Sequence, residues 1–401
     1  MNISPPAAPV RAPQAALRRR SAARERRGMA LMLAILMIVV ITVLVIGGVF
    51  TSTMEFRGGR NSLVEQRALA VAEYGLNAEV SRWDTGRNLQ PGAGGMAIGA
   101  MDELVRYVAD EDTAFVTVTR LTDNTFWVIA DGRASIGRSA LESRRRTNAL
   151  VRLAYPTIEP KGAITSAGDV QLTGNSTVTG ADTPPAGWGC AAPGPPVSAI
   201  HVPPGANVDH KAKNIITQPG VPDVLYDAAA GDSNLYVRYG TESWNSLVAN
   251  ASIVLPGGVY NGIQPVGTST SCTAGNTNWG EPNRGGGSVQ GCYGHFPIIY
   301  SETSLHINGN GRGQGILIVN GDLKLNGNFD FYGVVIVRDN VDKGNGTATI
   351  HGAVYARDAM FEENIWSGNQ NVSYSRCAIE NALRGSAILT RVKERHWSML
   401  Y

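Results

Sequence analysis

The chain has 401 residues, enough for two or more domains or for one long repetitive domain. Charged residues make up 17% of it and it has 47 glycines, a composition that favours β structure with many turns and argues against a long soluble helical bundle. The net charge of +2 gives no indication of nucleic acid as a partner.

The N-terminus joins a basic segment to an apolar one. Residues 1–28 contain seven arginines and one glutamate, whereas residues 29–50, MALMLAILMIVVITVLVIGGVF, contain no charge. As a helix these 22 residues would span about 33 Å, enough to cross a bilayer core of about 30 Å. A cleaved secretory signal, the alternative, would have a shorter apolar region that ends in a small-x-small site. The pattern predicts a cytoplasmic leader at 1–28 and a transmembrane helix at 29–50.

The helix is expected to continue outward from the membrane, because residues 60–83 contain no proline and carry apolar residues spaced 3, 4, 4 and 3 apart. These apolar residues, which share one helical face, are Leu69, Ala72, Leu76, Val80 and Trp83.

A small antiparallel sheet is expected after this helix. Residues 114–130 alternate apolar and polar on both sides of 122–125, which predicts a hairpin, and residues 148–154 could add a third strand. The three arginines at 144–146 are interpreted as part of a solvated connection. Residues 51–155 would then form a helix and a small β-sheet.

Two stretches resemble a known family. RRGMALMLAIL (residues 26–36) and QRALAVAEYGL (residues 66–76) are similar to the N-terminus of PilX-type pilus assembly proteins, which are minor pilin-like proteins of type IV pili. The residues that match are Arg27, Gly28, Ala30, Leu31, Gln66, Ala68, Ala72, Glu73, Gly75 and Leu76.

The resemblance implies a processing site, partners and a location. A prepilin peptidase would cut between Gly28 and Met29. The helix would lie in the lipid bilayer of the inner membrane and later pack against other pilin-like subunits. The N-terminus would be cytoplasmic, and the bulk of the chain periplasmic or on a surface filament. The sequence departs from major pilins at Leu33, where they carry a glutamate. The alternative is an unprocessed single-span anchor.

A repeat occupies the C-terminal half. Glycine followed by four apolar residues recurs at Gly315, Gly333 and Gly352, at spacings of 18 and 19 residues. Gly162–Gly180 aligns with Gly315–Gly333 over the same length. A fixed period is typical of a solenoid and predicts a parallel β-helix of about 18 residues per rung, whereas a meander of hairpins needs no such period. Val170 and Leu323 would stack in adjacent rungs.

The resulting fold class is α+β and mostly β. A transmembrane helix continues into a pilin-like helix with a small antiparallel sheet, and a parallel β-helix follows at 162–356. A loop-rich insertion at 181–314, rich in Pro, Gly, Ser and Asn, would interrupt the β-helix, and residues 357–401 would form a C-terminal segment.

Four cysteines permit two disulfides in an oxidising compartment. Cys272 and Cys292 bracket a glycine-rich segment, which a disulfide would stabilise by about 3 kcal/mol. Cys190 would then pair with Cys377. The latter lies in YSRCAIENAL (residues 374–383), a stretch that also resembles the C-terminal ending of PilX-like chains.

The search for catalytic chemistry is negative. The sequence contains no Gly-x-Ser-x-Gly, His-Glu-x-x-His or Walker motif, and it predicts no enzyme, metal site or cofactor. The sequence therefore predicts a non-catalytic, minor pilin-like component of a type IV pilus or related secretion filament. The alternative is a membrane-tethered β-helix adhesin or carbohydrate-active protein.

Overall fold

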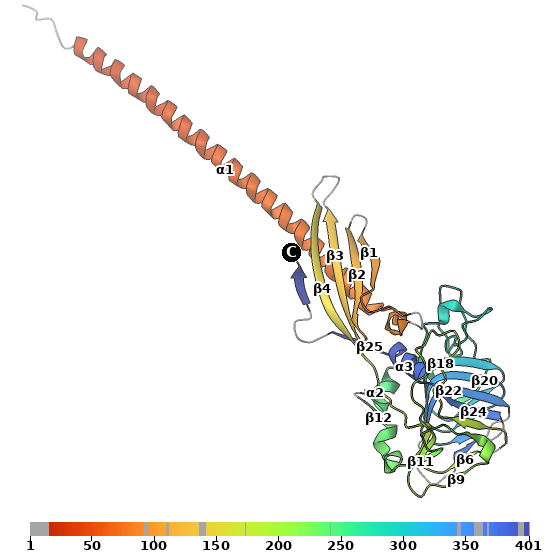
Figure 1. Ribbon diagram of the computed structural model, residues 1–401. Helices are drawn as coiled ribbons and strands as arrows, with labels where there is room; N and C mark the ends of the chain where they lie inside the picture. Colours follow the sequence, from red (N-terminus) through yellow and green to blue (C-terminus); the bar gives the residue numbers. More distant parts are fainter. Residues whose placement is uncertain are drawn as a thin grey trace, which may run out of the picture.

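The structure is a computed structural model that describes residues 16–91, 95–109, 112–135, 142–172, 174–240, 242–342, 346–356, 364–366, 369–391 and 397–400. A long N-terminal helix leads into an antiparallel sheet, and a lobe built mainly of parallel strands lies beyond the C-terminal end of that helix (Figure 1). The chain is therefore mostly β after one long apolar helix.

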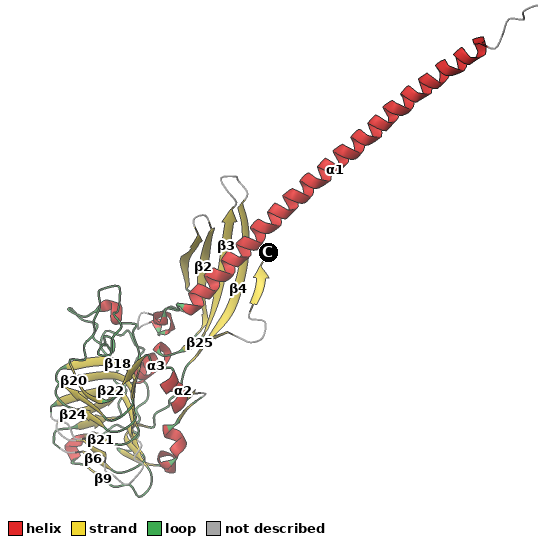
Figure 2. Ribbon diagram, turned by 180° about the vertical axis from the view of Figure 1, so that it is seen from behind, coloured by secondary structure: helices red, strands yellow, loops and turns green. Residues whose placement is uncertain are grey.

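The N-terminal helix α1 (Ala16–Ser81) contains 66 residues. At 1.5 Å per residue it is about 100 Å long. Its first half stands free of the rest of the chain, and its second half lies against one face of the antiparallel sheet (Figure 2). The apolar segment and the amphipathic segment expected from the sequence thus form one continuous element.

The antiparallel sheet has six strands, ordered β1-β2-β3-β4-β25, with β26 also paired to β4. Its strands are β1 (Met101–Ala109), β2 (Asp112–Thr122), β3 (Thr125–Ser135), β4 (Glu142–Ala154), β25 (Ile388–Arg391) and β26 (Trp397–Leu400). The expected hairpin is confirmed, since Thr122 of β2 lies opposite Thr125 of β3. The arginines at 144–146 lie within β4 and not in a connection, because β4 begins at Glu142.

Three further sheets are parallel throughout the described residues. The largest contains β5 (Gly162–Ser166), β7 (Thr177–Thr179), β8 (Ser198–Val202), β10 (Ile215–Ile216), β11 (Val224–Tyr226), β14 (Ile253–Leu255), β16 (Ile298–Ser301), β18 (Gly311–Val319), β20 (Phe329–Val337), β22 (Thr347–Ala356) and β24 (Asn369–Tyr374). The second contains β15 (Gly258–Asn261), β17 (Leu305–Asn308), β19 (Leu323–Leu325) and β21 (Val341–Asp342). The third contains β6 (Val170–Leu172), β9 (Val208–Asp209) and β23 (Asn364–Trp366).

Short elements fill the connections. They are η1 (Thr85–Asn88), η3 (Ala212–Asn214), η4 (Ala228–Gly231), η5 (Ser233–Tyr236), η6 (Gln290–Cys292), the hairpin of β12 (Arg238–Tyr239) and β13 (Glu242–Ser243), α2 (Trp244–Ala249) and α3 (Arg376–Gly385). The inward side chains of the parallel sheets form one large apolar core, while a separate core lies between α1 and the antiparallel sheet.

The repeat seen in the sequence sets the register of the large sheet. Ile298 lies opposite Ile316, Ile316 opposite Val334, and Val334 opposite Ala353, so successive partners are 18, 18 and 19 residues apart. One repeat of 18 or 19 residues, which we call a coil, therefore brings the chain back to the equivalent position in the neighbouring strand of this sheet.

The spatial order of the coils differs from their order in the sequence. β22 pairs with β5, β5 pairs with β8, and β8 pairs with β11. On its other side β22 continues through β20, β18 and β16 to β14. The first coils of the chain therefore stack on the last ones, and residues 227–252 carry the chain from one end of the stack to the other.

This order makes two expectations wrong. Val170 pairs with Asn364 and Val208, and Leu323 pairs with Leu305 and Val341, so Val170 and Leu323 do not lie in adjacent coils. Likewise 181–314 is not a loop-rich insertion throughout, because it supplies β8, β14 and β16 to the large sheet. Matching glycine patterns show that two coils have the same shape, but they do not specify which coils are neighbours.

The expected C-terminal segment is divided between the sheets. β24 joins the large parallel sheet, whereas β25 and β26 pair with β4 of the antiparallel sheet. The C-terminus therefore ties the two parts of the molecule together.

Candidate functional site

The apolar half of α1 is the most exposed apolar surface of the described chain. Its large side chains between Met29 and Phe50 range in exposure from 47% at Val40 to 76% at Met32. The mean hydropathy of an 18-residue window in this helix reaches 3.3. A surface of this size is stable only when lipid or other apolar helices cover it. It has the length and composition of a membrane anchor.

The few polar groups of this half are satisfied within the helix. The Thr42 hydroxyl donates to the Ile38 carbonyl at 2.7 Å, and the Thr51 hydroxyl donates to the Gly47 carbonyl at 2.8 Å. Threonines that bond to their own helix backbone present no free donor to an apolar environment. These threonines are therefore compatible with burial in lipid or in a helix bundle.

The second half of α1 packs closely on the antiparallel sheet through small residues. A Cβ added to Gly75 would lie 2.4 Å from the Ala114 Cβ, and one added to Gly132 would lie 2.1 Å from the Ala68 carbonyl oxygen. Separations below 3 Å leave no room for a side chain. Glycine on both the helix and β3 therefore lets the two backbones approach each other.

The helix motif found in the sequence divides between the two faces of α1. Ala72, Gly75 and Leu76 are buried against the sheet, Glu73 is half-buried, and Gln66 is exposed. The small and apolar members thus fix the helix on its own sheet. The polar members remain on the side from which a neighbouring molecule can approach.

The expected processing site lies far from the folded body. Gly28 and Met29 are consecutive residues within α1, and Met29 is 65% exposed. Leu33, the position at which major pilins carry a glutamate, is 62% exposed. Cleavage between Gly28 and Met29 stays a prediction.

A buried ionic group fixes the C-terminal end of α1. Glu79 is fully buried, and its carboxylate accepts from Arg87 at 2.6 Å and also pairs with Arg106 of β1. Arg87 in turn binds Asp102 at 2.6 Å. Burial opposes the charge on Arg87, but the hydrogen bonds to Glu79 and Asp102 prevail and raise its pKa. The sequence analysis missed this group, although a glutamate between Leu76 and Val80 is a detectable signal.

Arg120 holds the segment that follows α1. Its guanidinium is fully buried and donates to the carbonyls of Leu89, Met96 and Asp123 at 2.8, 2.6 and 2.8 Å. Burial lowers its pKa from the ordinary value. One side chain thus satisfies three backbone acceptors that no strand partner serves, and it organises the turn between helix and sheet.

The N-terminal region has a match among known families. Residues 27–77 match the family model described as PilX N-terminal. The match begins next to the expected processing site and ends where α1 lies on the sheet. It supports a type IV pilin-like protein, and the PilX N-terminal segment coincides with the apolar half and the packed half of α1.

The remaining comparisons add little to this match. Among solved structures, the competence-associated pilin ComZ from Thermus thermophilus is similar at 13% identity and a TM-score of 0.25, over 84% of this chain and 97% of that one. A TM-score this low establishes no shared fold. None of the curated proteins matches the chain.

Helix α3 connects the PilX N-terminal segment and its sheet to the parallel sheets. Asn88, close after α1, donates to the Arg384 carbonyl at 3.2 Å, and the Gln90 backbone N–H donates to Asn381 at 3.4 Å. The Cys190–Cys377 disulfide fixes the start of α3 to the segment between β7 and β8. The lobe is therefore fastened to the anchor helix by side-chain contacts as well as by chain connections.

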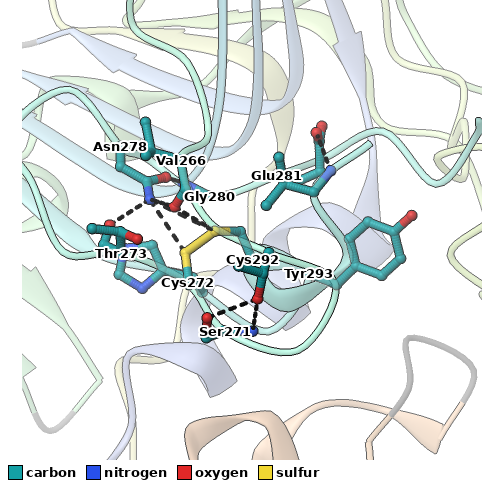
Figure 3. The surroundings of a disulfide bond; sticks show 12 residues. Val266, Ser271, Cys272, Thr273, Asn278, Gly280, Glu281, Cys292 and Tyr293 are labelled. Atoms are coloured by element: carbon teal, nitrogen blue, oxygen red, sulfur yellow. Dashed lines mark hydrogen bonds between the residues drawn. A yellow bond between two sulfur atoms is a disulfide. The ribbon is translucent and has the colours of Figure 1, made fainter. Parts of the chain in front are cut away.

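The second disulfide shapes the loop between β15 and β16 (Figure 3). Around the Cys272–Cys292 bond, the Asn278 amide donates to the Val266 and Thr273 carbonyls at 2.9 and 2.6 Å. Both disulfides have the pairing expected from the sequence. Within the described residues, no group of three or more His, Cys, Asp or Glu is arranged to hold a metal ion.

Proposed function

We propose that the protein is a non-catalytic, minor pilin-like component of a type IV pilus or related secretion filament. The observation that carries the proposal is the form of α1, which is a single helix with an exposed apolar first half and a second half locked onto a sheet. The match of residues 27–77 to the PilX N-terminal model supports it.

The physical basis is that the apolar half of α1 can bury its exposed side chains either in lipid or against other apolar helices. Before assembly it lies in the inner membrane, with the basic residues 1–28 on the cytoplasmic side and the sheets in the periplasm. On assembly it exchanges lipid for neighbouring pilin-like helices. Without such partners, extraction would cost about 25 cal/mol for each Å² of apolar surface exposed to water.

A prepilin peptidase cleaves the leader between Gly28 and Met29 in this proposal. The mature chain then begins at the start of the apolar segment. Leu33 in place of a glutamate favours a position that occurs rarely in the filament, because one subunit contact need not repeat there. The parallel lobe beyond the C-terminal end of α1 supports a place near the filament tip, where it meets no subunit above it (Figure 1).

We further infer that the three parallel sheets are the faces of a β-helix-like stack displayed outside the membrane. Partners spaced 18 or 19 residues apart and glycines repeated at the same edge support this inference. In this arrangement the lobe is a rigid body suited to display rather than to catalysis.

Deletion of the gene, with counting of surface filaments and mass spectrometry of the mature N-terminus in the parent strain, tests the proposal. Fewer filaments in the deletion strain and a mature chain that begins at Met29 are expected. Leu36→Arg should block membrane insertion and assembly, since a charge near the apolar midpoint costs about 2.5–3.5 kcal/mol. Leu121→Arg, an exposed site on the sheet, is the matched control. Normal filaments and motility in the deletion strain, with no second gene to compensate, would leave the tethered adhesin as the better account.

A further inference from the structure

Residues 227–240 and 242–252, which lie between β11 and β14, form a pocket against the end of β20. The pocket encloses about 350 Å³. This volume falls within the range of roughly 300–1,000 Å³ that is typical of small-molecule sites. The residues that line it are Tyr236, Val237, Arg238, Ser243, Trp244, Asn245, Val337 and Arg338.

The walls of the pocket are held in place by hydrogen bonds. The Tyr236 hydroxyl donates to the Ala230 carbonyl at 2.7 Å, and the Trp244 backbone N–H donates to the Val237 carbonyl at 2.9 Å. Ser243 caps α2 by accepting from the Ser246 N–H at 3.2 Å. The phenol ring of Tyr236 and the backbone that carries Trp244 are therefore fixed before any ligand arrives, which lowers the entropy cost of binding.

Both charged residues that line the pocket are basic. Arg238 and Arg338 both line it and are exposed, and neither forms an ion pair within the described part of the chain. Arg338 donates at 2.7 Å to the neutral amide oxygen of Asn320, which orients its guanidinium without neutralising it. Two guanidinium groups at one pocket favour an anion that accepts in a planar, forked geometry, which is the geometry of a carboxylate.

The uncharged side chains of the pocket indicate what else the ligand contains besides a carboxylate. Trp244 offers a half-buried aromatic ring, and Ser243 and Asn245 offer a hydroxyl and an amide that can bond to either donors or acceptors. We propose that this pocket binds a carboxylate-bearing sugar unit, such as a uronic acid, with its carboxylate on Arg238 and Arg338 and its ring on Trp244. The hydroxyl groups of the sugar would reach Ser243 and Asn245. This proposal stands apart from the function of α1 and holds whether or not the chain enters a filament.

Calorimetric titration of the full chain in detergent micelles tests the proposal, with D-glucuronate, a short uronate oligosaccharide and neutral D-glucose as ligands. Glucuronate should bind and glucose should not. Added salt should weaken binding, because the attraction depends on charge. Equal affinity for the monosaccharide and the oligosaccharide assigns the site to a free or terminal unit. Tighter binding of the oligosaccharide assigns it to a polymer.

Three variants and one control locate the binding. Arg238→Gln and Arg338→Gln should each weaken it about tenfold or more, as expected for loss of a charge-assisted hydrogen bond. Trp244→Ala should weaken it, while Trp244→Phe should keep part of the affinity. Arg82→Gln, an exposed arginine outside the pocket, should change nothing. Circular dichroism of every variant separates loss of binding from loss of fold.

Several results would overturn the proposal. Absence of glucuronate binding at millimolar concentration would do so, as would equal binding of glucose. Binding that survives both arginine substitutions would place the ligand elsewhere. Displacement of glucuronate by acetate or inorganic phosphate at equal concentration would show that the pocket takes a small anion with no contribution from a sugar ring.

Discussion

Gly315 lies directly opposite Gly333 in the large parallel sheet, and a Cβ added to Gly333 would stand 2.0 Å from the Gly315 carbonyl oxygen. Gly333 also has a φ of +140°, and the added Cβ would lie 3.0 Å from the Ala382 Cβ of α3. The next glycine of the repeat, Gly352, continues the row with a φ of +149°. The repeated glycines therefore lie where the backbones of neighbouring strands approach each other closely, and at Gly333 α3 also packs against this position.

Replacement of Gly333 by alanine should therefore destabilise the lobe. A left-handed backbone costs a residue with a side chain about 1–2 kcal/mol, and overpacking adds about 1–3 kcal/mol. Guanidinium unfolding should give a loss of about 2–5 kcal/mol in the free energy of unfolding. Gly275→Ala is the control, because no atom lies within 4 Å of its added Cβ. Equal stability of both variants would contradict the strain argument.

The two disulfides should contribute unequally to stability. The Cys272–Cys292 bond closes a separation of 20 residues and the Cys190–Cys377 bond one of 187. Loop-closure entropy gives about 3 kcal/mol for the first and about 5 kcal/mol for the second. Unfolding of the C272S/C292S and C190S/C377S variants, each compared with the parent chain, measures the difference. A larger loss from C272S/C292S would refute the entropic ranking.

Arg120→Met should loosen the segment between α1 and β1. The substitution leaves the carbonyls of Leu89, Met96 and Asp123 without this donor, and of these three bonds the one to Leu89 is buried while the other two are part-buried. An unsatisfied buried acceptor costs about 1–3 kcal/mol, and water can reach the two part-buried carbonyls, so we expect a loss of about 1–3 kcal/mol in unfolding free energy. Limited proteolysis should then cut between residues 83 and 100, whereas Arg82→Met should remain resistant there. Unchanged cleavage in the Arg120 variant would show that other contacts hold the segment.

Stability should fall below neutral pH, partly through His351. This ring stacks on Tyr332 with a centroid separation of 4.2 Å, and burial lowers the pKa of His351 from 6.5 to about 4. As the pH falls, the unfolded chain therefore binds the proton before the folded chain does. Stability is full above pH 6.5, declines toward pH 4 and levels off below it, with a slope of up to about 1.4 kcal/mol per pH unit from this group.

His351→Gln separates this effect from the others, because His201 and His295 also have pKa values lowered by burial and titrate in the same direction. Thermal unfolding of both chains between pH 4 and pH 7 should show a weaker pH dependence in the variant. Identical curves for the two chains would show that His351 has the same pKa in the folded and unfolded states, which would contradict the prediction.

Sequence reasoning succeeded where the signal is local. The apolar run ending at Phe50 predicts the exposed helix, and the alternating residues around Thr122 predict the hairpin. The spacing of Gly315, Gly333 and Gly352 predicts that they lie opposite one another in neighbouring strands, because the length of each repeat can be read directly from the sequence. None of these inferences needs information about distant parts of the chain.

It failed where partners are distant in the sequence. The arginines at 144–146 are interpreted from the sequence as part of a solvated connection, yet Arg146 lies opposite Asp131 and pairs with it once β3 and β4 are aligned. Arg120 carried a usable signal, since it follows Ala114, Val116 and Val118 at the inward parity of β2. The sequence carried no signal for which strand pairs with β5, because repeats with similar glycine patterns have similar strand edges.

The spatial order of the strands has a consequence for synthesis of the chain. The chain emerges from its N-terminus, so β5 leaves the ribosome long before β22, the strand that completes its pairing. Until the last quarter of the chain arrives, one edge of β5 has no native neighbour and stays open to wrong partners. A chain that stops early, for instance within β20, would carry an intact anchor and an unfinished lobe. Only a chain that extends through β22 can therefore complete the pairing of β5.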